Sequence, residues 1–186
     1  MTDLILEPTA VAGWQRLVRE AARDCRIELA EELEGYLVHT LIHLTREARL
    51  GRGAIAPQYL EALLAAGPRG AEDLRRVGDQ CLLLAGLYPR QASRRLVRVG
   101  YFVDMGRSAY ARLYELLERA NAQLYRQLSE AFVSLADVLQ GLRGEAALSP
   151  LEAIEYWQDT GSRVQARRLA EHFGPGWTAP GSRRPQ

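Results

Sequence analysis

The stretch that decides the fold is GAEDLRRVGDQCLLLAGLYP, residues 70–89. It begins with charged residues and becomes almost wholly apolar over residues 81–87. A helix that is apolar on every side is normally buried, so we expect this run to pass through the centre of a helical bundle. The Tyr88-Pro89 pair predicts its end, because proline lacks an amide hydrogen and clashes with the preceding turn.

The sequence on both sides of this segment predicts further amphipathic helices, since apolar residues recur at spacings of three and four. The predicted helices cover residues 9–23, 28–48, 57–66, 70–87, 99–119, 121–141, 150–159 and 162–173, with a short basic helical segment at 92–97. No stretch alternates apolar and polar residues over the length of a useful strand. The sequence therefore predicts an all-α protein, a single-domain bundle of seven or eight helices.

The chain is expected to divide into three parts. Residues 1–145 form the core of the bundle, residues 146–173 form a C-terminal helical hairpin packed on that core, and residues 174–186 form a disordered tail. The hairpin begins with a capping-box pattern, in which Ser149 and Glu152 flank a proline at the first helical position. The tail is rich in Gly, Pro, Ser and Arg, which cannot bury enough apolar surface to fold.

Composition places the chain among globular proteins, with 47% hydrophobic and 25% charged residues. A net charge of +1 offers no electrostatic reason for general binding to nucleic acid or to an anionic membrane. All 24 basic residues are arginine. Arginine binds phosphate well, but a coding bias is the favoured explanation for the lack of lysine, so arginine clusters are weak evidence for phosphate sites here.

The two cysteines form no CxxC motif, and the first residues lack the charge and apolar run of a signal peptide. No apolar run approaches the length of a membrane span. We therefore expect a cytoplasmic bacterial protein with free thiols and no membrane partner.

The first candidate site follows one edge of the predicted helix at 28–48. That edge carries, in order, Glu32, Tyr36, His39, His43 and Glu47. Two histidines at i and i+4 project from one face of a helix and can chelate one metal ion. Together with a phenol and carboxylates they could also relay protons. The alternative is that both imidazoles lie half-exposed and bond only to neighbouring groups.

The second candidate site is the face of the helix at 99–119 beside its apolar stripe. This face carries Gly100, Asp104, Arg107, Ser108 and Ala111. Small residues let another backbone or a ligand approach closely, which predicts a ligand pocket or a dimer seam. The alternative is an ordinary helix contact with a surface ion pair between Asp104 and Arg107, worth little stability.

Two weaker candidates involve charge. Asp79 precedes the most apolar run and could have a raised pKa, although a salt bridge to Arg75 is the favoured interpretation. The basic run comprises Arg90, Arg94, Arg95 and Arg98, and it is interpreted first as a solvated face and second as a site for an acidic partner.

The C-terminal hairpin offers a last possibility. Its second helix carries Arg163, Gln165, Arg167 and Arg168, which are residue types that can contact bases or phosphates. Trp157 stands where a helix-turn-helix would need a small residue, so a structural hairpin is the favoured interpretation.

These observations lead to three functional hypotheses. The first is a non-catalytic protein-interaction or regulatory module that binds a protein partner or forms a homodimer. The second is a metal- or small-molecule-binding enzyme or sensor that uses the edge through His39 and His43, with a cofactor the sequence does not identify. The third is a weak DNA-binding regulator acting through residues 149–173, although nucleic acid is not an expected partner. No catalytic residue is assigned, and whether the protein is an enzyme stays open.

Overall fold

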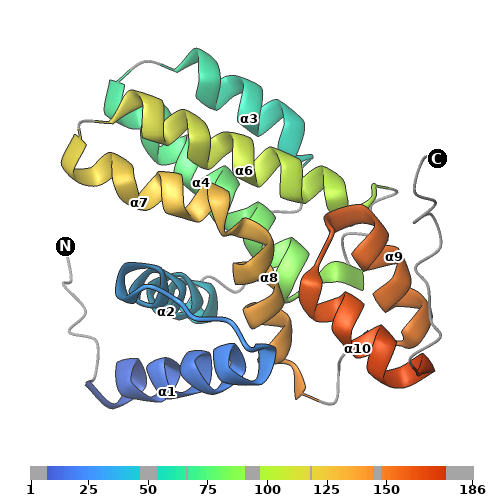
Figure 1. The fold of residues 1–186 in the computed structure, drawn as a ribbon. Coiled ribbons are helices and arrows are strands. Elements are labelled where there is room, and N and C mark those ends of the chain that lie inside the picture. The colour runs from blue at the N-terminus through green and yellow to red at the C-terminus, as the bar shows by residue number, and fades with distance from the viewer. Residues whose placement is uncertain are drawn as a thin grey trace.

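The computed structural model describes residues 8–46, 54–65, 67–90, 97–117, 119–144 and 148–174. Within these residues the fold is all-helical, with nine helices and no strand (Figure 1). The helices are α1 (Pro8–Cys25), α2 (Glu31–Arg46), α3 (Ile55–Leu64), α4 (Gly67–Gly86), α6 (Val99–Leu116), α7 (Arg119–Glu130), α8 (Phe132–Gly141), α9 (Pro150–Thr160) and α10 (Arg163–Phe173). The all-α prediction is confirmed, and the number of helices is slightly higher than predicted.

The extra helix comes from a break in the predicted helix at 121–141. The structure divides it at Ala131, whose backbone has φ −89° and ψ 7°. Neither proline nor glycine marks this position, so the break carries no local signal. Because of this break, α7 packs along α6, whereas α8 runs in another direction and packs against α1 and α4 (Figure 1).

The predicted central run is confirmed. Residues 81–86 are all buried, and Cys81, Leu82 and Leu84 are completely inaccessible to solvent. The helix that carries them, α4, packs against α3, α6 and α8. No helix in the described part of the chain combines the length and apolar character needed to cross a membrane.

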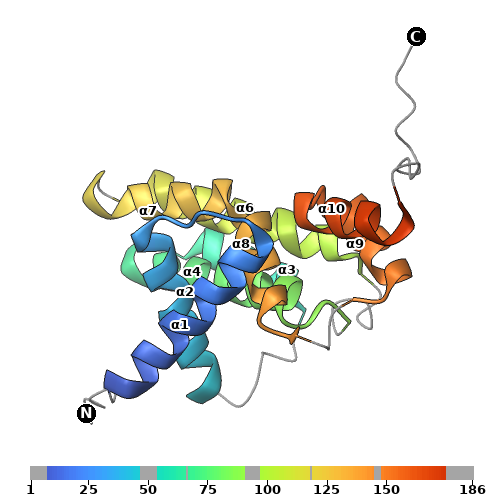
Figure 2. The ribbon, with the colours of Figure 1, turned by 60° about the horizontal axis from the view of Figure 1, so that its bottom comes forward.

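The two last helices form a hairpin at one end of the molecule, while α7 begins at the other end (Figures 1 and 2). Ser149 and Glu152 form the predicted capping box at the start of α9. Gly161 joins the two helices with a left-handed φ of 70°, which glycine adopts without steric cost.

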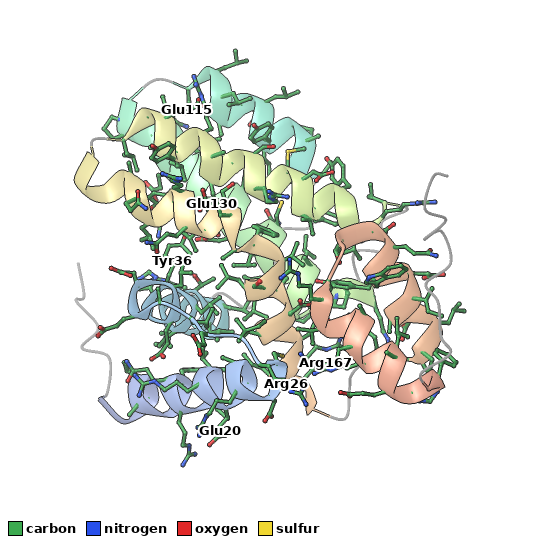
Figure 3. All side chains as sticks on the ribbon, in the orientation of Figure 1. Glu20, Arg26, Tyr36, Glu115, Glu130 and Arg167 are labelled. Atoms are coloured by element: carbon green, nitrogen blue, oxygen red, sulfur yellow. The ribbon has the colours of Figure 1, made fainter. Side chains whose placement is uncertain are left out.

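Buried polar side chains attach this hairpin to the bundle. The Ser162 hydroxyl donates to Asp137 Oδ1 and Oδ2 at 2.7 and 2.9 Å, and both residues are buried. Gln165 Nε2 donates to Gln140 Oε1 at 2.9 Å. Arg167 Nη2 donates to the backbone carbonyl of Cys25, the last residue of α1, at 2.9 Å. Figure 3 shows Arg167 close to Arg26, the residue that follows α1. These contacts place the hairpin against α8 and α1.

Three predicted features fall outside the described residues. They are the basic segment over most of residues 92–97, Glu47 of the first candidate edge, and the tail beyond Gly174.

Candidate functional site

A cluster of polar side chains joins α2, α4 and α6. Tyr36 donates its hydroxyl to Asp79 Oδ1 at 2.5 Å, and Tyr110 donates to the same oxygen at 2.8 Å. Tyr125 of α7 lies beside both phenols, with ring centroids 6.4 Å from Tyr36 and 6.1 Å from Tyr110. Figure 3 shows Tyr36 between α2 and α7. We call these four residues the Tyr–Asp cluster.

A glycine in α4 allows Tyr110 to approach Asp79 closely. Tyr110 is fully buried, and its ring lies directly against the backbone of α4 at Gly78. A Cβ atom at position 78 would lie 2.5 Å from a ring carbon of Tyr110. Glycine is therefore required there for Tyr110 to reach Asp79, one residue further along α4.

Burial controls the ionisation of the cluster. It raises the pKa of Asp79, while the two tyrosine hydrogen bonds and the nearby Arg75 guanidinium lower that pKa in part. Burial, followed by the charge of Asp79, also raises the pKa values of Tyr36 and Tyr110. Both phenols thus keep their protons at neutral pH and act as donors to the carboxylate.

The sequence pointed to only part of this cluster. It predicts Tyr36 as a binding residue, and it predicts a salt bridge between Asp79 and Arg75. The structure gives the carboxylate two tyrosine hydroxyls and leaves Arg75 a longer-range electrostatic role. Tyr110 falls on the apolar stripe of the predicted helix at 99–119, and the sequence predicts no contact between it and Asp79. The available signal was its phenol, because a buried tyrosine hydroxyl usually needs a partner.

Replacing Tyr110 with phenylalanine should lower the free energy of unfolding by about 2 kcal/mol, because the buried carboxyl group of Asp79 loses a hydrogen-bond donor. Urea denaturation monitored by circular dichroism would measure the loss. The matched control is Tyr114→Phe on the same helix, where the side chain is 41% exposed and little change is expected. Equal effects of the two substitutions would contradict a special role for the bond to Asp79.

The two predicted metal ligands converge on each other at the solvent edge of this cluster. The Nε2 atoms of His39 and His43 lie 3.0 Å apart, and both side chains are exposed. Burial, then His43 and Arg75, lower the pKa of His39, and His43 in turn lowers the pKa of Asp79. Among the described residues, no group of three or more His, Cys, Asp or Glu is placed to hold a metal ion.

The structure separates the residues of the second candidate face. Gly100 is covered by α9, since a Cβ atom there would lie 2.9 Å from the carbonyl oxygen of Asp159. Asp104, Arg107 and Ser108 remain exposed and line a shallow depression of about 370 Å³. Arg107 Nε donates to the backbone carbonyl of Ser129 at 3.2 Å, which ties α6 to α7. The absence of a side chain at Gly100 thus allows α9 to pack closely against α6. The residues of this face that remain exposed are polar.

A cleft that the sequence did not indicate lies between α9 and the start of α6. It encloses about 460 Å³, within the roughly 300–1,000 Å³ range of small-molecule sites. Its lining residues include Pro89, Arg90, Val97, Arg98, Val99, Leu148, Glu152, Glu155, Tyr156, Gln158 and Asp159. Both arginines of this lining are in ion pairs, Arg90 with Glu152 at 2.6 Å and Arg98 with Asp159 at 3.5 Å. The cleft is therefore electrically mixed and does not favour an anion. The other two arginines of the predicted basic run, Arg94 and Arg95, lie outside the described residues.

The residues proposed for DNA contact have other roles in the hairpin. Gln165 is 2% exposed and bonds to Gln140, while Arg167 bonds to the carbonyl of Cys25. Of the four residues Arg163, Gln165, Arg167 and Arg168, Arg163 is the one that stays exposed when the hairpin packs on the bundle. This arrangement favours the structural interpretation of the hairpin.

Comparison with protein families, with curated proteins and with solved structures finds no match for this chain. The chemistry of the described residues must therefore carry any functional conclusion. Four features of the described residues could serve a function. They are the Tyr–Asp cluster, the histidine pair, the cleft beside α9 and the exposed apolar residues of α3.

Proposed function

We propose that this protein is a non-catalytic interaction module that associates with a second copy of itself through α3. The observation that carries this proposal is the apolar character of α3 on two opposite sides. Ile55 and Ala62 are buried against the bundle. On the other side Leu60, Leu63 and Leu64 are 58%, 38% and 86% exposed. We call these three leucines the leucine face.

The spacing of the leucine face makes it suitable as a contact surface. Residues at i, i+3 and i+4 are neighbours on a helix, so the three side chains form one patch. Figure 1 shows α3 on the outer side of the bundle, along α4 and α6. Complete burial of one leucine stabilises an association by about 1.5–3 kcal/mol, so covering this face would contribute substantially.

Two further large apolar side chains are exposed on α6, a helix that packs against α3. Tyr114 and Leu116, in its last turns, are 41% and 52% exposed. Large apolar side chains exposed on neighbouring elements are typical of protein–protein contact sites.

Charges near the leucine face favour a second copy over a strongly charged partner. Glu61 is exposed on α3, and Arg69 is exposed in the first turn of α4. On α6, Arg112 pairs with Glu115 at 2.7 Å, and both are exposed. A two-fold axis brings each surface against its own copy, so a surface that holds both signs can be complementary to itself.

The interior polar groups fit a role without catalysis. The Asp79 carboxylate accepts two hydrogen bonds from tyrosines whose pKa values are raised, and the Asp137 carboxylate accepts a hydrogen bond from a buried serine. Such contacts hold helices together, whereas a catalytic acid or base must reach a substrate.

A Leu60→Glu/Leu64→Glu double variant should remove self-association, because burying two carboxylates in an apolar contact is costly. Sedimentation velocity over a concentration series would measure the monomer–dimer equilibrium of the full chain. We expect the wild-type protein to dimerise as its concentration rises and the double variant to stay monomeric with unchanged helicity.

The matched control is Leu151→Glu in α9, where the leucine is 67% exposed but lies in the hairpin, away from α3. This variant should dimerise like the wild type. A wild-type protein that stays monomeric at high micromolar concentration would refute the proposal, as would equal dissociation of the Leu151→Glu control.

A further inference from the structure

We infer that His39 and His43 form a surface chelate for one divalent transition-metal ion, with copper(II) and nickel(II) preferred to zinc(II). The inference is independent of self-association through α3, which involves other helices. It begins from the distance of 3.0 Å between the two Nε2 atoms. At this distance the two Nε2 atoms are in hydrogen-bond contact, so they already lie close enough together to share one ion.

The separation of the nitrogens is compatible with two adjacent positions around a square-planar ion. With metal–imidazole bonds of about 2.0–2.1 Å, nitrogens 3.0 Å apart subtend an angle of about 95° at a shared ion. This angle is close to the right angle between neighbouring ligands of a square-planar ion, the geometry that copper(II) and nickel(II) favour. A tetrahedral zinc site would need a nitrogen separation of about 3.3 Å. The general affinity order also places copper(II) above the other divalent ions of the first row.

The helix holds the two ligands in place before an ion arrives. The i, i+4 spacing puts both rings on one face of α2, with ring centroids 4.3 Å apart. When an ion binds, both rings carry a proton on Nδ1, so both Nε2 lone pairs face the metal. Because both histidines are exposed, an ion can enter from solvent.

The protein supplies two ligands to this site, since no third His, Cys, Asp or Glu joins them among the described residues. The remaining coordination positions belong to water or to a group from another molecule. Such an ion exchanges readily, which distinguishes this site from a closed structural metal centre.

Two charged groups on α4 face the pair and act in opposite directions. Arg75 is close enough to lower the pKa of His39, so its guanidinium also opposes a bound dication. Asp79 lies on the same side of α4 one turn further on and interacts electrostatically with His43. The arginine therefore provides a way to alter affinity without touching either ligand.

The test is a titration of the full, tag-free chain with copper(II), followed by calorimetry and electron paramagnetic resonance. We expect one ion per chain, a spectrum with nitrogen donors in the equatorial plane, and weaker binding of zinc(II). Replacing either His39 or His43 with alanine should weaken binding about 100-fold, because chelation by two linked ligands is lost. Arg75→Ala should strengthen binding.

The matched control is His172→Ala, which removes an exposed histidine of α10 and should leave copper binding unchanged. Copper binding that survives in a His39→Ala/His43→Ala variant with the same affinity and spectrum would overturn the inference. The dimerisation of that variant should equal that of the wild type, so failure of the metal site and failure of self-association are separate results.

Discussion

Replacing Gly106 with alanine is expected to lower the free energy of unfolding by about 3 kcal/mol, since it overpacks the centre of the bundle. A Cβ atom at this position would lie 2.4 Å from a ring carbon of Phe132 and 2.8 Å from the Cβ atom of Cys81. Phe132 and Cys81 are completely buried, so neither can move aside without disturbing other core residues. The clash exceeds the gain in helix propensity, which is about 0.5–1 kcal/mol for the same change without steric conflict.

The matched control is Gly35→Ala in α2, where a Cβ atom would meet nothing within 4 Å. This substitution should raise the free energy of unfolding by about 0.5–1 kcal/mol through helix propensity alone. Urea denaturation of the two variants under identical conditions gives both values. A Gly106→Ala protein as stable as the wild type would contradict the packing of α6 against α4 and α8.

The contribution of Asp137 to the stability of the protein should fall as pH rises from about 4 to about 8. Burial raises the pKa of this carboxyl from 3.8 to about 7, although Ser162 and then Arg168 and Arg167 oppose the rise. Between these two pH values the folded protein holds the proton more often than the unfolded chain does. The contribution to stability is therefore complete below about pH 4 and is lost as pH rises through about 7. A shift of about three pKa units corresponds to at most ~4 kcal/mol.

Asp137→Asn should flatten this pH dependence, because asparagine stays neutral and its oxygen can still accept the hydrogen bond from Ser162. Denaturant midpoints measured at pH 5 and pH 8 would test the expectation. Some slope should remain, since burial also raises the pKa of Asp79. Asp104→Asn is the control at an exposed carboxylate. Equal slopes in the wild type and in Asp137→Asn would show that Asp137 does not carry the effect.

The predicted elements that hold in the structure depend on local chemistry. The apolar run at 81–86 is the buried centre of α4, and Ser149 and Glu152 cap α9 as the pattern required. Apolar spacing, capping side chains and prolines act within one or two turns, so a single sequence displays them. These local features were sufficient to predict the fold class and the approximate positions of the helices that the structure describes.

The sequence predicted which site residues lie close together only where those residues share one helix. The histidine pair is an example, because an i, i+4 spacing brings two rings together wherever the helix lies. The break at Ala131 had no such signal and was missed. It follows from the packing of α7 on α6 and of α8 on α1 and α4.

The tertiary structure alone decided the partners of the buried polar groups. Asp79 meets a tyrosine 43 residues away and another 31 residues away, and Asp137 meets Ser162 across 25 residues. No periodicity links positions so far apart, because their proximity depends on how whole helices cross. The sequence by itself therefore determined an all-helical chain with an apolar central helix. The packing of those helices decided which carboxylates are buried, which glycine lies under α9, and which leucines remain exposed.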